Sequence, residues 1–115
     1  MDADTTVNEL REEIRQFVKE RDWEQYHTPK NLGMSITIEA SEIMELFQWN
    51  SNEQSRDLVK ETETQGLVAD ELADVMIYCF ILADQSDIDI SSAVRLKLER
   101  NRGRFPVGYM PTPED

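Results

Sequence analysis

The chain has 115 residues, with 24 acidic and 12 basic side chains, and its formal net charge is −12. This charge excludes general binding to DNA or RNA, because a protein that grips a polyanion needs a positive field. It does not exclude small phosphate compounds, since bound divalent cations reverse the local sign of charge. At this length we expect a single domain over residues 1–115, with a modest core that partner chains would help to complete.

The sequence contains no candidate membrane segment. Its longest apolar run, Val75 to Ala83, is far shorter than the roughly 20 residues that a spanning helix needs. The segment Met1-Asp2-Ala3-Asp4 lacks the basic and apolar parts of a secretory signal, and the single cysteine, Cys79, has no partner for an internal disulfide. These features favour a cytoplasmic protein.

Two helices are predicted in the first half of the chain. Thr6 and Glu9 have the spacing of a capping box, and apolar residues then recur at steps of three and four, which predicts a helix from about 6 to 20. Thr28-Pro29 predicts the start of a second helix, from about 29 to 49, because proline suits the first helical turn. The β-branched residues 36–38 weaken the helical propensity before Glu39.

The second half predicts two further helices. The polar residues 50–65 form a loop or a poorly packed short helix, and Gly66 marks a break before a third helix, from about Leu67 to Asp84. Because residues 75–83 are apolar almost all round, this helix should be buried on nearly every side. Asp89 caps a fourth helix, from about 90 to 102, with Gly103 as its end, and the proline-containing tail from about 105 is irregular.

No credible strand pattern is present, so the fold class is all-α. Four helices, one of them too apolar for a small monomer to hide, indicate a four-helix bundle that is completed by oligomerisation.

Paired carboxylates stand out on two of these helices. Glu39 and Glu42 are three residues apart on the second helix, and Glu71 and Asp74 are three apart on the third. Side chains with this spacing are neighbours on one helix face, and like charges there slightly destabilise the helix. No cation lies within one turn of either pair. A surface shaped only by solubility would more naturally pair these acids with Lys or Arg.

If the two helices pack antiparallel through these faces, the four carboxylates converge on an all-oxygen site suited to Mg²⁺ or Mn²⁺. The alternative is that all four are solvated, and the residues alone leave these two interpretations about equally weighted. A di-iron bundle requires Glu-x-x-His pairs, whereas the only histidine, His27, is in neither motif.

The same segments resemble a known family. Glu39-Ala-Ser-Glu42-Ile-Met-Glu45-Leu-Phe-Gln-Trp49 and Asp70-Glu71-Leu-Ala-Asp74-Val-Met-Ile-Tyr78 resemble the motifs of the MazG-like nucleoside triphosphate pyrophosphohydrolases, which belong to the all-α NTP pyrophosphatase superfamily. The likeness extends over about residues 17 to 109 and is closest to the small branch that includes the dCTP pyrophosphatases. Two further matches are Arg21-Asp-Trp23-Glu-Gln-Tyr-His27 and Lys97-Leu-Glu-Arg-Asn101-Arg-Gly-Arg104-Phe-Pro-Val. Ala40 departs from the family pattern, since many relatives carry a second consecutive Glu there.

The resemblance implies that Mg²⁺ is bound by Glu39, Glu42, Glu71 and Asp74, with Mn²⁺ as an alternative ion. The implied reaction is hydrolysis of a nucleoside triphosphate to the monophosphate and pyrophosphate, with dCTP-like substrates first. A carboxylate near the attacking water would accept its proton, and Glu42 and Glu45 are the two candidates.

The remaining candidate residues would bind substrate. By resemblance, Trp23, His27 and Trp49 line the nucleobase pocket, although periodicity alone places Trp49 in a core or an interface. Tyr109 is a further candidate for closing the site. Phosphate contacts are expected from three residues that follow steps of four and three: Lys97, Asn101 and Arg104.

We therefore predict a metal-dependent nucleotide pyrophosphohydrolase that trims the nucleotide pool and assembles as a dimer or a dimer-based tetramer. The alternative is a non-catalytic acidic helical module that regulates a basic protein.

Overall fold

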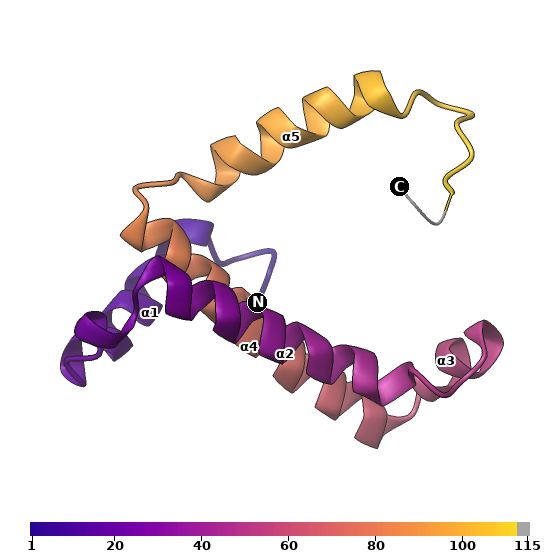
Figure 1. Cartoon of the computed structure of the whole chain (residues 1–115), viewed down its shortest axis with the longest axis horizontal. Coiled ribbons are helices and arrows are strands. Elements are labelled where there is room, and N and C mark those ends of the chain that lie inside the picture. The colour runs from indigo at the N-terminus through magenta and orange to yellow at the C-terminus, as the bar shows by residue number, and fades with distance from the viewer. Residues whose placement is uncertain (113–115) are drawn as a thin grey trace.

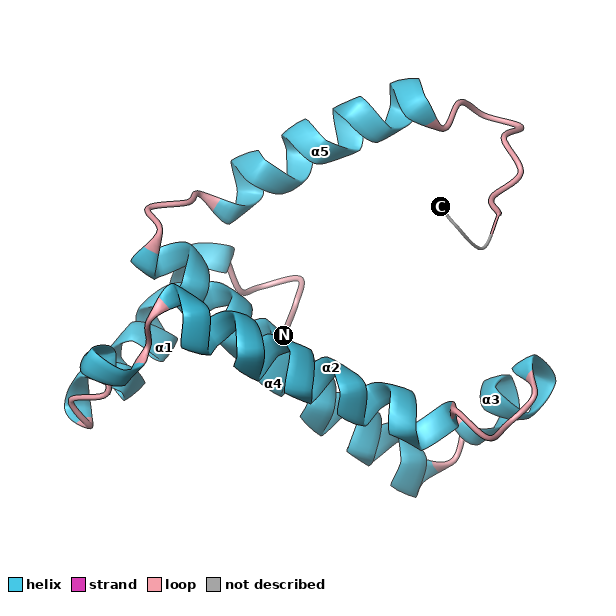
Figure 2. Cartoon of the chain, viewed as in Figure 1, coloured by secondary structure: helices cyan, strands magenta, loops and turns pink. Residues whose placement is uncertain are grey.

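The structure is a computed structural model that describes residues 1–112, and within that range it contains helices and no strand (Figure 2). The all-α fold class is therefore confirmed. The chain forms α1 (Val7–Glu20), the short 3-10 helix η1 (Glu24–Tyr26), α2 (Pro29–Phe47), α3 (Asn52–Leu58), α4 (Thr62–Gln85) and α5 (Ile90–Arg104). No helix in the described part is both long enough and apolar enough to cross a membrane. The last three residues of the predicted irregular tail lie outside the described range.

Side-chain caps fix the starts of three helices where the sequence predicts them. The Thr6 hydroxyl accepts a hydrogen bond from the Glu9 backbone N–H at 3.1 Å, and the Glu9 carboxylate accepts one from the Thr6 N–H at 3.3 Å. Thr28 caps α2, in which Pro29 is the first residue, and Asp89 caps α5. Each cap satisfies N–H groups that have no partner inside the helix.

Two predicted helix boundaries are wrong, and both involve glycine. α4 begins at Thr62 rather than Leu67, so Gly66 lies inside the helix and does not break it. α5 likewise continues through Gly103 to Arg104. A glycine inside a helix costs only about 1 kcal/mol relative to alanine, which the packing of a long helix outweighs. Residues 52–58 form α3, the short helix that was one of the two expectations for that segment.

The centre of the fold is an antiparallel pair, α2 and α4, which lie side by side along most of their lengths (Figure 1). α1 packs against the C-terminal half of α4. The core lies where these helices meet and contains Val18, Leu32 and Ile81, of which Leu32 is 1% exposed. This pairing places the Glu39 and Glu71 turns opposite each other.

Much apolar surface stays open on the single chain. Met76 and Ile77 of the apolar run in α4 are exposed, so the chain buries that run only in part. α5 runs apart from α2 and α4 (Figure 1), and none of the closely packed helix pairs among residues 1–112 includes it. Its side chains Val94, Leu96 and Leu98 are about half exposed or more.

Candidate functional site

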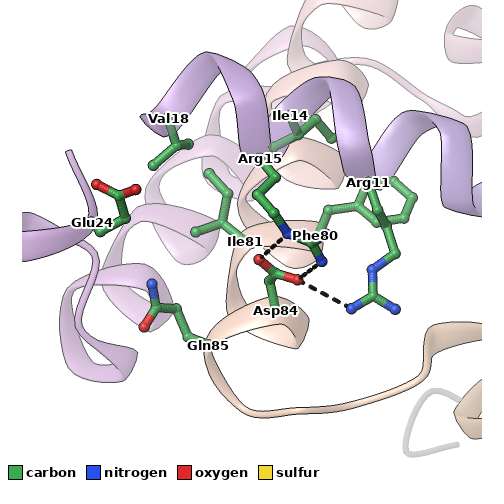
Figure 3. A pocket seen from close by; sticks show the side chains of 9 residues that line it. All are labelled: Arg11, Ile14, Arg15, Val18, Glu24, Phe80, Ile81, Asp84 and Gln85. Carbon is green, nitrogen blue, oxygen red and sulfur yellow. Dashed lines mark hydrogen bonds and ion pairs between the residues drawn. The ribbon is translucent and has the colours of Figure 1, made fainter. Parts of the chain in front are cut away.

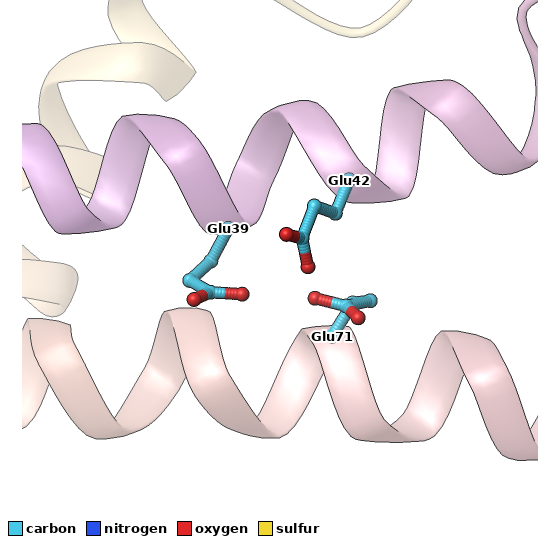
Figure 4. A group of neighbouring side chains, drawn as sticks. All are labelled: Glu39, Glu42 and Glu71. Carbon is cyan, nitrogen blue, oxygen red and sulfur yellow. The ribbon is translucent and has the colours of Figure 1, made fainter.

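Three of the four predicted metal ligands come together between α2 and α4. Each of these residues offers one carboxylate oxygen, and the three oxygens lie within 4.8 Å of one another. Figure 4 shows the two carboxylates of α2 pointing toward the one from α4. This carboxylate cluster consists of Glu39, Glu42 and Glu71.

The cluster is electrostatically unfavourable without a cation. Hydrogen bonding to Glu42, followed by burial, raises the pKa of Glu71 to about 7, and the Glu71 Oε2 atom is buried without a partner. The pKa of Glu39 is raised as well. Here burial is the largest cause, and the charges of Glu42 and Asp74 add to it. Carboxylates that are held together and partly desolvated favour a bound proton or a bound cation.

Asp74, the fourth predicted ligand, lies one turn further along α4 and is exposed. Its carboxylate is outside the carboxylate cluster but close enough for its charge to act on Glu39. It also lines a cavity of about 200 Å³ between α1, α4 and the two residues that flank η1, Trp23 and His27. Asp74 therefore joins the carboxylate cluster to this cavity.

Aromatic and aliphatic side chains form the rest of that cavity, which we call the aromatic pocket. Trp23 meets Phe17 edge-to-face at 5.7 Å between ring centroids and meets His27 edge-to-face at 6.5 Å. His27 is half-buried, and its Nδ1 atom is buried without a partner. An apolar wall with an unpaired imidazole nitrogen is suited to a planar heterocycle that also forms hydrogen bonds. The pocket is lined by Phe17, Val18, Trp23, His27, Asp74, Ile77, Tyr78 and Ile81.

Trp49 does not reach this pocket in the single chain. It follows the C-terminus of α2 and is 88% exposed, whereas His27 precedes the N-terminus of the same helix. A helix of 19 residues is about 28 Å long, so the two side chains lie at opposite ends of it.

The phosphate-binding candidates also lie apart from the carboxylate cluster, because all three are on α5 or at its end. Lys97 and Arg104 are exposed, Asn101 is half-buried, and the Arg104 guanidinium lies 4.8 Å from the Phe105 ring centroid. Tyr109 packs edge-to-face on Phe105 at 5.1 Å in the tail after α5. Glu45, the second candidate proton acceptor, is exposed and outside the carboxylate cluster.

Five residues that line the pocket were not among the sequence-based candidates: Phe17, Val18, Ile77, Tyr78 and Ile81. Phe17 and Val18 belong to the apolar face of α1, and the other three belong to the apolar run of α4, so their pattern indicated core packing. Only the antiparallel packing of α1 on α4 shows that these faces leave a cavity beside Asp74.

A family model, described as the MazG-like family, matches residues 34–109 of this chain. The match covers both carboxylate pairs and the whole of α5.

The chain is also similar to curated proteins and to a solved structure. It is 35% identical over 105 residues to dCTP pyrophosphatase 1 of Bos taurus and 37% identical over 102 residues to that of Rattus norvegicus. These matches cover 91% and 89% of this chain but only 62% and 60% of the relatives, so the chain spans about three-fifths of their length. A crystal structure of a pyrophosphatase from Archaeoglobus fulgidus superposes with a TM-score of 0.80 at 40% identity, covering 86% of this chain and 91% of that one.

Proposed function

The chain belongs to the MazG-like family, and on that premise we propose that it hydrolyses nucleoside triphosphates to the monophosphate and pyrophosphate. The observation that carries this proposal is the adjacency of two unlike sites. The carboxylate cluster suits a cation-bound triphosphate and the aromatic pocket suits a base, and Asp74 lies between them. A nucleotide presents these same two parts at its two ends.

The residues of the carboxylate cluster fit a divalent metal ion. Its donors are all carboxylate oxygens, and one of them, Glu71 Oε2, is buried without a partner. Hard oxygen ligands favour Mg²⁺, with Mn²⁺ as a substitute. Glu39, Glu42 and Glu71 would hold the ion, with Asp74 as the fourth ligand. When bound, the metal offsets the charge of the triphosphate and of the transition state at the α-phosphorus.

The chain's own groups would do the rest. Trp23 offers a stacking face, worth about 1 to 3 kcal/mol for a base. The His27 Nδ1 atom can form a hydrogen bond to base or sugar. For the proton of the attacking water the proposal favours Glu42, because its carboxylate lies within the carboxylate cluster, whereas Glu45 is exposed outside it.

We assign the remaining candidates to a second copy of the chain. Lys97, Asn101 and Arg104 sit on a helix that does not pack on its own chain, and Trp49 projects from the far end of α2. α5 ends in basic residues, whereas α2 and α4 carry the acids, so the two surfaces are complementary in charge. A homodimer, or a tetramer built from dimers, would cover the open apolar surfaces and bring α5 to the carboxylate cluster of its partner.

We place this activity in the cytoplasm, because a chain with one cysteine suits a reducing compartment. Its role there would be to trim the deoxynucleotide pool or to remove unwanted nucleotides, with dCTP and its modified forms as the first substrates. The names of the similar mammalian proteins support that substrate class.

The test is a screen of all common and several modified nucleoside triphosphates with Mg²⁺, scored for monophosphate and pyrophosphate. We expect release of pyrophosphate, greatest with dCTP-like substrates, and its loss when EDTA is added. Release of orthophosphate alone would contradict the reaction type. No turnover of any nucleotide would favour the non-catalytic acidic module.

A further inference from the structure

An ion pair between α1 and α4 lies at the far end of the helix contact that forms the aromatic pocket. The Arg15 guanidinium donates to both carboxylate oxygens of Asp84, with Nε to Oδ2 at 3.0 Å, and Arg11 Nη2 donates to Oδ1 at 3.3 Å (Figure 3). Hydrogen bonding from Arg15 lowers the pKa of the Asp84 carboxyl, so the pair is ionised at neutral pH. A forked arginine-carboxylate pair fixes direction as well as distance.

The ion pair and the aromatic pocket lie along the same face of α4. Asp74, Ile77, Ile81 and Asp84 follow steps of three and four, so they form a single stripe along the helix. Asp74, Ile77 and Ile81 of this stripe line the aromatic pocket, and at the end beyond them Asp84 holds α1. Apart from this ion pair, the side chains that join α1 to α4 are mostly apolar, and few of them are fully buried. Apolar contact is non-directional, whereas the forked ion pair is directional.

The backbone of Trp23 is bound to the C-terminal end of α1. The backbone N–H of Trp23 donates to the Val18 carbonyl at 3.1 Å, and the backbone N–H of Asp22 donates to the Lys19 carbonyl at 3.1 Å. These two bonds, with Asp22 at a left-handed φ of 53°, form a Schellman motif at the end of α1. A shift of α1 by one residue would therefore carry the indole about 1.5 Å along this face of α4.

His27 is tied to Trp23 through η1, because the Tyr26 backbone N–H donates to the Trp23 carbonyl at 2.9 Å, but it is also anchored to α2. It directly precedes Thr28, the cap of α2, and the Asn31 side-chain amide of α2 donates to the Tyr26 carbonyl at 3.1 Å. The carboxylate cluster is likewise held by the α2–α4 pair, without α1. The position of Trp23 relative to the rest of the candidate site thus depends on how α1 sits on α4.

We propose that Asp84 is a positioning residue, which through Arg15 sets the register of α1 on α4 and thereby holds Trp23 in the wall of the aromatic pocket. The expected change in KM rests on the proposed function. The expected change in the placement of Trp23 does not. It assigns Asp84 no contact with substrate or metal.

The kinetic test compares Asp84→Asn with Glu12→Gln. Both substitutions remove a carboxylate that pairs with Arg15, but Glu12 is on α1 itself and makes no bridge to α4. We expect Asp84→Asn to raise KM about tenfold, because small displacements of positioning groups have large effects, while kcat stays within about twofold. The affinity for Mn²⁺ alone, measured by titration, should not change. Glu12→Gln should match the wild type in all three quantities.

Arg15→Lys provides a second variant that keeps the charge but loses the fork. It should raise KM by a smaller factor than Asp84→Asn. Circular dichroism of each variant reports whether the helices stay folded. A joint fall in kcat, helix content and Mn²⁺ affinity would assign the pair to general stability and overturn the proposal.

A fluorescence measurement tests the placement of Trp23 without any substrate. In a Trp49→Phe background the remaining indole is Trp23. Introducing Asp84→Asn there should shift its emission to the red and increase its quenching by acrylamide, whereas Glu12→Gln should do neither. Unchanged emission and quenching would overturn the proposal. A shift of Trp23 in a protein that turns over no nucleotide would refute the proposed function and leave the positioning role standing.

Discussion

The α2–α4 pair carries the predicted metal ligands, and α5 carries the predicted phosphate-binding residues. Only the first of these two halves of the candidate site is assembled within one chain. α2 and α4 bring three carboxylates of opposite helices within 4.8 Å of one another. α5 carries Lys97 and Asn101 on a helix that stands apart from that pair (Figure 1). A sequence motif thus identifies the residues of a site, whereas the chain that supplies each residue is a separate structural question.

The largest effect is expected from Glu71→Gln, which acts on the α2–α4 half. It removes the carboxylate whose buried oxygen has no partner, so it should lower pyrophosphate release by about a thousandfold or more, as loss of a metal ligand does. Glu63→Gln is the matched control, because Glu63 is an exposed acid in the first turn of the same helix. Steady-state kinetics check both variants. Unchanged turnover in Glu71→Gln would remove the metal assignment.

The second prediction tests whether α5 acts on a partner. Asn101→Ala and Glu71→Gln should each be inactive, but a mixture refolded together should regain activity. In randomly mixed two-fold dimers about a quarter of the sites would hold both intact halves. The control mixes Glu71→Gln with Glu39→Gln, whose defects lie in the same half and should not complement. An inactive mixture of the first two variants would show that α5 does not serve the site of a partner chain.

The pH dependence of the metal-free protein should come from Glu71. Its pKa rises on folding from 4.5 to about 7, so stability from this group is greatest below pH 4.5 and is lost as the pH rises to about 7. Thermal unfolding in EDTA should therefore show a loss of stability over this range, and Glu71→Gln should flatten it. Mn²⁺ affinity should increase over the same range, with release of a proton that calorimetry in two buffers detects. A pH-independent affinity would contradict this assignment.

The smallest effects are expected from glycine substitutions, one in α4 and one in α5. A Cβ added at Gly66 of α4 or at Gly103 of α5 would meet no atom within 4 Å. Gly66→Ala should therefore raise the free energy of unfolding by about 0.5 to 1 kcal/mol. In an assembled oligomer, where α5 unfolds together with the rest, Gly103→Ala should give the same gain. In dilute protein it should only increase the helix content. Denaturation at two protein concentrations separates these results, and a destabilising Gly66→Ala would show that the assembly covers α4 there.

Local signals predicted much of this fold. Thr6, Thr28 and Asp89 cap helices because each offers an oxygen to a free N–H within three residues, so neighbouring sequence is sufficient to find them. The spacing of Glu39 and Glu42 predicted a common face for the same reason. The start of α4 was missed because the cost of Gly66 is local, whereas the packing that outweighs it comes from α2.

The features that depend on distant residues were not visible in the sequence. Asp84 lies 69 residues from Arg15 along the chain, and each by itself has the pattern of an ordinary exposed charge. Trp49 and α5 have apolar or basic surfaces, but nothing in their spacing says whether their own chain or a second chain covers them. The sites of Trp49, Lys97, Asn101, Arg104 and Tyr109 therefore stay predictions.

The small core has a consequence for how the protein would behave in a cell. Five hydrophobic side chains are buried in the described part of the chain, which is little for a domain of this length. In the proposed assembly, folding and association would be one equilibrium, so the working fraction would depend on how many copies are present. Gene dosage would then change activity more steeply than in proportion, and a cell that halves its supply of the chain would lose more than half of the function.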